Sequence, residues 1–297
     1  MQLQKATRKK SKLRLNISGP AGSGKTYSAL LMAKGLVGNW DKIAVIDTEN
    51  GSASLYDHLG DFQSLDLQQP FSPERYAEAI DICIKAGIEC IIIDSTTHEW
   101  NGPGGCIDIN ERLAQSKFKG NTWSAWSQTT PRHDAFVQKV LQCPVHVITC
   151  TRSKMETVMT DDKKVKKLGM KDLQREGWEY ELTVSLNIDR DTHTATASKD
   201  RTELFEGMDP FIITEATGAT IRDWCEKGIE VDHKPIQATT TPTKLALADK
   251  AFTDGLNRIK NGEHRLVQMM KDTFTLSPEQ VLELDAAMVP TEVTTAQ

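Results

Sequence analysis

The stretch Gly19-Pro-Ala-Gly-Ser-Gly-Lys-Thr26 fits the pattern G-x-x-x-x-G-K-[ST] and sets the fold expected around it. Residues 13–18 alternate apolar and polar side chains, which predicts a strand, and the Ala, Leu and Met content of residues 27–37 predicts a helix. Between a strand and a helix, this pattern binds phosphate groups through backbone N–H groups. The expected phosphate-binding residues are Gly19, Gly22, Ser23, Gly24, Lys25 and Thr26.

Three polar side chains are expected to complete a site for ATP and Mg²⁺ around this loop. In such loops the lysine, here Lys25, reaches the β and γ phosphates and takes part in catalysis, and the hydroxyl of Thr26 is a ligand of Mg²⁺. Asp94 ends the apolar run Ile91-Ile-Ile-Asp94, where P-loop proteins hold an acidic residue beside Mg²⁺. An aspartate after an apolar strand is common, but its place downstream of the loop favours the metal-binding interpretation.

The general base is expected elsewhere in the chain, because Ser95 stands where many P-loop ATPases place a glutamate. Glu49 is the preferred catalytic candidate, since it lies just past a second predicted strand, residues 42–47, at the carboxyl edge of the sheet. Asp47 and Glu99 remain alternatives for the same role. The competing interpretation is that Glu49 is a solvated loop carboxylate without a catalytic role.

Apolar strands alternate with helices over the first half of the chain, which predicts an α/β fold with a mostly parallel sheet flanked by helices. Two long polar segments, residues 95–130 and 152–177, interrupt the alternation and are predicted as irregular loops, although residues 106–117 also suit a helix. The expected strands are residues 13–18, 42–47, 89–94 and 144–149, and the expected helices are residues 27–37, 72–86 and 131–142.

A β-hairpin is predicted from residues 181–188 and 194–198, which flank the turn sequence Asp-Arg-Asp-Thr-His and would extend the sheet with antiparallel strands. Lys199 and Arg201 follow its second strand. Because residues two apart share a face of an extended segment, these two cations suit a clamp on a γ-phosphate. A surface pair without function is the alternative.

The composition suits one α/β core with a small appendage: 297 residues, 38% hydrophobic and 26% charged. No run of about 18 apolar residues is present and the N-terminus is basic, so we expect a cytoplasmic protein without a membrane partner. The predicted organisation is a basic arm at 1–12, a core at 13–230, a linker at 231–243, a small helical region at 244–289 and a disordered tail at 290–297.

The six cysteines are scattered without C-x-x-C pairs and lie in apolar stretches, which favours reduced, buried thiols over zinc sites or disulfides. The net charge of −5 argues against a surface coated in positive charge for nucleic acid, but it leaves room for a local basic surface.

Taken together, these motifs resemble the RecA-type nucleoside-triphosphatase core, most closely the phage-encoded, core-only RecA-like proteins of single-strand annealing and strand pairing, over residues 12–224. Ile46-Asp-Thr-Glu-Asn-Gly-Ser-Ala-Ser-Leu-Tyr56 is similar to the segment that carries the catalytic glutamate, which corresponds to Glu49. Val147-Ile-Thr-Cys-Thr-Arg-Ser-Lys154 is similar to the strand that leads into the second DNA-binding loop. The resemblance implies a γ-phosphate sensor at Thr149 or Cys150, although RecA has glutamine where Cys150 aligns.

The Lys-Asp-Arg element at 199–201 resembles the Lys-Asn-Arg motif of RadA and the paired cations of DnaB-like helicases. In those relatives the cations reach the ATP of a neighbouring subunit. The resemblance therefore implies that Lys199 and Arg201 act in trans, within a homo-oligomeric ring or filament.

The same resemblance implies that residues 96–130 and 153–177 hold single-stranded DNA. Trp123 and Trp126 of the first segment would either stack on bases or belong to the core. Cationic side chains in and beside the second segment would bind phosphates: Arg152, Lys154, Lys163, Lys164, Lys166, Lys167 and Lys171.

The function expected from these features is ATP-dependent binding of single-stranded DNA in phage recombination, with DNA-stimulated ATP hydrolysis. A single-strand DNA-binding protein is a candidate partner. Two alternatives remain open at this point: a ring-forming motor or helicase-loading ATPase, and a P-loop kinase of small molecules.

Overall fold

The computed structural model describes residues 10–159, 165–228, 245–246, 249–261, 263 and 265–287. The chain divides into two compact units, Met1–Asp232 and His233–Gln297. The predicted linker at 231–243 and tail at 290–297 lie outside the described residues. Within the described ranges, no helix combines the length and the apolar character that crossing a membrane requires.

The first unit is built on a sheet with the order β3-β2-β4-β5-β1-β7-β8, with β6 paired to β5 off this path. Its strands run parallel from β3 to β7, and β8 joins β7 antiparallel. The predicted α/β fold is therefore confirmed. The strands are β1 (Arg14–Gly19), β2 (Ile43–Asp47), β3 (Gln63–Asp66), β4 (Cys90–Asp94), β5 (His146–Met159), β6 (Val165–Asp172), β7 (Val184–Ile188) and β8 (Ala195–Asp200).

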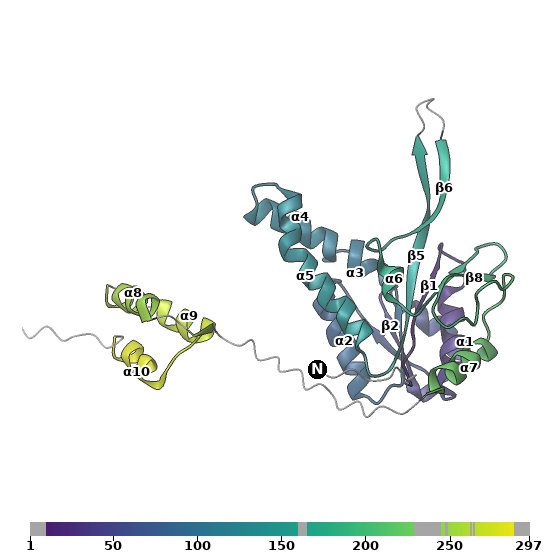
Figure 1. Cartoon of the computed structure of the whole chain (residues 1–297), viewed down its shortest axis with the longest axis horizontal. Helices are drawn as coiled ribbons and strands as arrows, with labels where there is room; N and C mark the ends of the chain where they lie inside the picture. The colour runs from purple at the N-terminus through teal and green to yellow at the C-terminus, as the bar shows by residue number, and fades with distance from the viewer. Residues whose placement is uncertain are drawn as a thin grey trace, which may run out of the picture. The chain divides into compact units, whose positions relative to one another are not determined.

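Helices α1 (Lys25–Val37) and α7 (Glu215–Glu226) pack together and bury Leu15 and Ile17 of β1 on one face of the sheet (Figure 1). Glycines stand at the helix contact. A Cβ at Gly35 would lie 1.9 Å from the carbonyl oxygen of Glu215, and one at Gly218 would lie 2.1 Å from that of Met32. Both backbones therefore approach too closely for any side chain.

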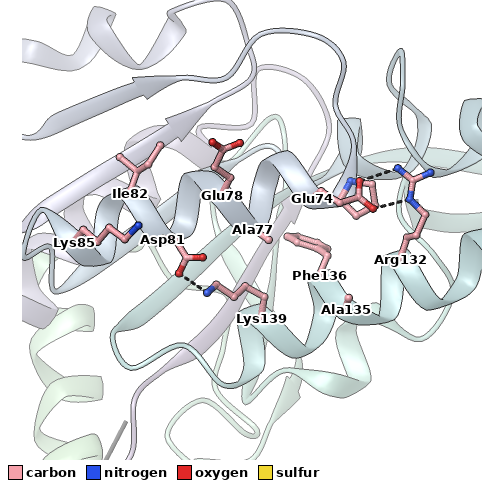
Figure 2. A pocket seen from close by; sticks show the side chains of 11 residues that line it. Glu74, Ala77, Glu78, Asp81, Ile82, Lys85, Arg132, Ala135, Phe136 and Lys139 are labelled. Carbon is pink, nitrogen blue, oxygen red and sulfur yellow. Dashed lines mark hydrogen bonds and ion pairs between the residues drawn. The ribbon is translucent and has the colours of Figure 1, made fainter. Parts of the chain in front are cut away.

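Helices α2 (Pro73–Lys85) and α5 (Thr122–Leu141) cover the opposite face. The buried rings of Tyr76 and Phe136 meet edge to face, 5.5 Å apart. Figure 2 shows two ion pairs that join the helices across a groove of about 490 Å³, Glu74 with Arg132 and Asp81 with Lys139. The short helices of this unit are η1 (Trp40–Lys42), η2 (Ser52–Leu59), α3 (Thr97–Asn101) and α6 (Trp178–Glu181).

The helix that residues 106–117 suited is confirmed as α4 (Cys106–Lys117), but the rest of the segment 95–130 is not the irregular loop that was predicted, because α3 and the first turns of α5 occupy much of it. Helix α5 begins at Thr122 rather than at 131 and contains Pro131. Asn121 accepts a hydrogen bond from the N–H group of Ser124 and caps the helix. One buried face then offsets the cost of the internal proline, about 3 kcal/mol; it consists of Ala125, Thr129, His133, Phe136 and Val140.

The predicted loop over residues 152–177 is also corrected. Strand β5 runs on to Met159 and pairs antiparallel with β6, so that the two strands form a hairpin that projects from the sheet (Figure 1). The many lysines of this segment suggested a loop, because they leave no alternation of apolar and polar residues that would indicate a strand. The hairpin is instead stabilised at its root, the end nearest the sheet, because β5 is a central strand of the sheet there.

The described residues of the second unit form three helices, α8 (Asp249–Lys260), α9 (Arg265–Thr273) and α10 (Pro278–Ala286), and a pair of two-residue strands, β9 (Leu245–Ala246) with β10 (Phe274–Thr275). Its core consists of Phe252, Ile259, Val267, Met270 and Leu284. A helical region was expected here.

Candidate nucleotide site

The loop between β1 and α1 has the conformation that its glycines allow. Gly22 and Gly24 adopt left-handed φ values of 79° and 88°, which are strained for other residues. No side chain caps the first turn of α1, so its N–H groups are available to an anion. The hydroxyl of Ser23 is buried and has no hydrogen-bond partner among the described residues. The loop therefore fits a bound phosphate chain.

Lys25 lies folded against this loop. Its ammonium group donates to the carbonyl oxygens of Gly19 and Pro20, at 3.0 and 2.9 Å. Burial lowers the pKa of Lys25, while the nearby Asp94 opposes that shift. The two carbonyl oxygens are weak substitutes for the phosphate oxygens that this cation is placed to bind.

Thr26 and Asp94 meet at the carboxyl ends of β1 and β4, as the metal-site prediction requires. The hydroxyl of Thr26 donates to the Asp94 carboxylate. Burial raises the pKa of Asp94, and the hydrogen bond from Thr26 and the charge of Lys25 oppose that rise. Oxygen ligands beside a buried carboxylate suit Mg²⁺. Lys25, Thr26 and Asp94 are thus brought together, and these residues fit ATP with Mg²⁺.

Glu49 lies past the end of β2 on the same edge of the sheet. Its carboxylate forms an ion pair with Arg152 and accepts a hydrogen bond from the Ser95 hydroxyl at 3.2 Å. The two alternative bases are held by partners of other kinds. Both oxygens of Asp47 accept backbone N–H groups of the following turn, and Glu99 is fully buried beside His133.

Thr149 and Cys150, the two predicted positions of a phosphate sensor, lie on opposite faces of the sheet. The hydroxyl of Thr149 donates to Asn16 Oδ1 at 2.9 Å, on the sheet face opposite α1. Alternation along β5 places Cys150 on the α1 face, opposite Asp94 in the strand register. Of the two sensor positions, Cys150 is the one that faces the nucleotide loop.

A polar network that the sequence did not reveal joins β6 to β1. Asp172, at the end of β6, accepts a hydrogen bond from the Ser18 hydroxyl and lies 3.5 Å from Asn16 Nδ2. Burial raises the pKa of Asp172. Ser18 directly precedes the glycine-rich loop, so both strands of the projecting hairpin are rooted at the nucleotide site. No sequence spacing predicts a contact over 154 residues.

His193 is a second residue that sequence reasoning missed. It lies in the turn between β7 and β8, and its Nδ1 donates to the carbonyl oxygen of Ser23 at 3.0 Å. The predicted hairpin placed this turn at the sheet edge. Nothing in the local sequence indicated that it lies against the loop.

Lys199 and Arg201 share a face of the extended segment, as expected, although β8 includes Lys199 and ends at Asp200. Both cations donate to the carbonyl oxygen of Tyr180 at the end of α6. Burial lowers the pKa of Lys199, and the positive charge of Arg201 adds to this shift. Within this chain neither cation contacts the glycine-rich loop.

The cations expected to bind DNA fall into four groups. Arg152 lies at the root of the hairpin and pairs with Glu49, whereas Lys154 and Lys171 are exposed and directly opposite each other on β5 and β6. Lys166 and Lys167 belong to β6. Lys163 and Lys164 lie outside the described residues.

The tryptophans of the first DNA-binding prediction differ in environment. Trp123 is 87% exposed near the start of α5, whereas Trp126 stacks on Trp100 with ring centroids 5.4 Å apart. Only Trp123 is thus available to stack on a ligand in this conformation. The groove of Figure 2 lies between α2 and α5 and contains none of the nucleotide-loop residues.

This fold and this site define a P-loop nucleotide-binding protein, with the phosphate loop, the Mg²⁺ residues and an acidic residue beyond β2 on one edge of a parallel sheet. A family model described as an AAA domain matches residues 11–220, well over half of the chain, and the protein belongs to that family. It therefore carries an AAA-type P-loop ATPase domain. A search of curated proteins found no match to the chain.

Proposed function

We propose that the protein is an ATP-dependent, single-stranded DNA-binding protein of phage homologous recombination that acts in strand annealing or pairing. The observation that carries the proposal is the root of the β5–β6 hairpin. Arg152 of β5 pairs with Glu49, and Asp172 of β6 bonds to Ser18 beside the phosphate loop. A ligand that moves the hairpin therefore acts directly on the residues that turn over ATP.

The exposed part of the hairpin supports a polyanionic ligand. Lys154 and Lys171 are paired across the two strands, and like charges directly opposite each other cost stability. Glu156 relieves this only in part, through an ion pair with Lys171 at 3.3 Å. Next to the lysines, Met155 and Met170 expose 44% and 49% of their surface and offer an apolar contact for bases.

The proposed chemistry is hydrolysis. ATP supplies the phosphoryl group, and Mg²⁺ bound by Thr26 and Asp94 neutralises charge on its oxygens. The phosphates displace the carbonyl oxygens that Lys25 contacts. Glu49 orients and deprotonates the attacking water once its carboxylate is released from Arg152.

Lys199 and Arg201 complete the proposed site from a neighbouring subunit. They lie in and just after the edge strand β8, on the far side of β7 from β1, and their side chains donate to main-chain oxygens of their own α6. At this edge of the sheet, the two cations are available to the γ-phosphate of an ATP molecule bound to the adjacent subunit. ATP then joins subunits into a filament or ring, and hydrolysis releases them.

The test is binding of fluorescent single-stranded DNA, measured by anisotropy across a salt series with ATP, ADP or no nucleotide. We expect tight, salt-dependent binding with ATP only. Lys154→Ala with Lys171→Ala should weaken binding and lower the salt slope by about 1.4, since each phosphate contact on a single strand contributes roughly 0.7. Lys85→Ala with Lys227→Ala removes the same charge from exposed sites elsewhere and should change neither. Equal binding with all nucleotide states, or none with any, contradicts the proposal.

A further inference from the structure

Three side chains that bind metals well converge outside the nucleotide site. Glu99 of α3, Cys106 at the start of α4 and His133 of α5 each offer one ligand atom, and these atoms lie within 4.8 Å of one another. The Glu99 Oε1 atom is 3.1 Å from Cys106 Sγ and 3.0 Å from His133 Nδ1. All three residues are buried, with at most 3% of their surface exposed.

Within the described residues, Glu99 has no ion pair with a lysine or arginine, and its carboxylate instead shares a hydrogen bond with His133 Nδ1. A buried carboxylate without a strong cation is costly. Burial and the charge of Glu99 raise the pKa of Cys106, so that its thiol keeps its proton unless a metal displaces it.

We propose that Glu99, Cys106 and His133 bind one zinc ion. A thiolate, a carboxylate and a neutral imidazole together carry the two negative charges that a divalent ion neutralises. Sulfur and nitrogen ligands favour zinc over Mg²⁺ or Ca²⁺, so this site is separate in chemistry from Thr26 and Asp94. A water molecule completes four-coordination.

The spacing of the ligand atoms suits this ion. Zinc lies about 2.0–2.3 Å from such atoms, so tetrahedral ligands are about 3.4 Å apart. The present separations from Glu99 Oε1 are 3.0 and 3.1 Å. The third separation, between the ligand atoms of Cys106 and His133, is within 4.8 Å, so the three side chains already surround a space of the size that the ion needs.

The surroundings hold the ligands in place. Gln174 Nε2 donates to Glu99 Oε2 at 3.4 Å and to the carbonyl oxygen of Thr96 at 2.8 Å. The ring of Trp100 packs against that of His133 at 5.2 Å. Partners of this kind orient metal ligands and exclude solvent. Because Thr96 follows Asp94 by two residues, a metal here fixes three helices beside the strand end that holds Asp94.

The test is metal content. The full chain, purified without a histidine tag or chelator and dialysed against metal-free buffer, should contain about one zinc per chain by mass spectrometry of the metal. Cys106→Ser, nearly the same size, should lose it. Cys83→Ser removes another buried thiol, in α2, and should keep it.

Cobalt gives a second measurement that does not depend on a variant folding. Co²⁺ added to the metal-free wild-type chain should produce a sulfur-to-cobalt charge-transfer band, which added Zn²⁺ should abolish. The proposal is overturned if the wild-type chain retains no zinc after incubation with Zn²⁺ and dialysis, if the cobalt spectrum has no thiolate band, or if Cys106→Ser and wild type retain equal zinc.

Discussion

The guanidinium group of Arg152, at the root of the β5–β6 hairpin, is ion-paired with the carboxylate of Glu49. While the pair persists, that carboxylate has one oxygen on Arg152 and the other on Ser95, so neither is free to orient water. Glu49, the residue proposed to activate water, is therefore restrained by the strand that leads into the hairpin.

Arg152→Ala should raise ATP turnover in the absence of DNA several-fold, because it frees Glu49, and should reduce the further stimulation by single-stranded DNA. Phosphate release with and without DNA measures both. Arg112→Ala, an exposed arginine of α4, is the matched control and should behave as wild type. A fall in DNA-independent turnover of Arg152→Ala would show that the ion pair positions Glu49 rather than restrains it.

Glu49→Gln should retain nucleotide binding and lose roughly 10²–10⁴-fold in turnover, the usual effect of removing a positioned base. Lys25→Ala should instead lose nucleotide binding, since it removes the cation of the phosphate loop. Binding of a fluorescent ATP analogue separates the two effects. Normal turnover by Glu49→Gln would refute the assignment.

Lys199→Ala should abolish turnover without weakening nucleotide binding to its own subunit, because the cation acts on a neighbour. Mixing it equally with Lys25→Ala should restore about one quarter of the sites, those with an intact loop on one subunit and an intact Lys199 on the next. Turnover of the mixture against each variant alone is the measurement. A mixture as inactive as its components contradicts a site shared between subunits.

The stability of the core should depend on His146, whose Nδ1 accepts the N–H group of Leu13 at 3.0 Å. Burial lowers the pKa of His146 to about 3, and the charges of Lys12 and Arg14 contribute. Between a pH of about 6.5, the usual histidine pKa, and a pH of about 3, the unfolded chain binds a proton at this side chain and the folded chain does not. The free energy of unfolding therefore falls by up to about 1.4 kcal/mol for each unit by which the pH is lowered.

His146→Asn retains an acceptor for Leu13 but does not titrate. Its unfolding midpoint in urea should therefore fall less than that of wild type between pH 7 and pH 5. His58→Asn, at an exposed position, serves as the control and should keep the wild-type slope. Equal slopes for wild type and His146→Asn would exclude this origin of acid sensitivity.

The sequence predicted the elements whose signal is local. The glycine-rich loop, the apolar strands and the β7–β8 hairpin were all recognisable, and Thr26 meets Asp94 because parallel strands end at one edge of the sheet. Lys199 and Arg201 share a face for an equally local reason.

The remaining features depend on contacts between distant segments. Helix α5 forms despite Pro131 because burial of one face contributes more free energy than the proline costs. The lysine-rich hairpin forms because β5 is already held in the sheet. The partners of Glu49 and Thr149 likewise come from other strands. Residue type and spacing do not encode such partners, so the irregular loops predicted around residues 106–117 and over 152–177 were wrong, while a sensor at Thr149 or Cys150 stays a prediction.

The continuity of β5 gives the hairpin a mechanical property. At about 3.3 Å per residue, the strand from Arg152 to Met159 spans roughly 23 Å, and its pairing with β6 shifts register once, between Glu156 and Thr157. A rotation of about 5° at the root therefore displaces the far end by about 2 Å, more than half of the roughly 3.4 Å rise per phosphate along one strand of duplex DNA. In the proposed function, a small angular change at the nucleotide would thus be amplified along the hairpin to the scale of one base step.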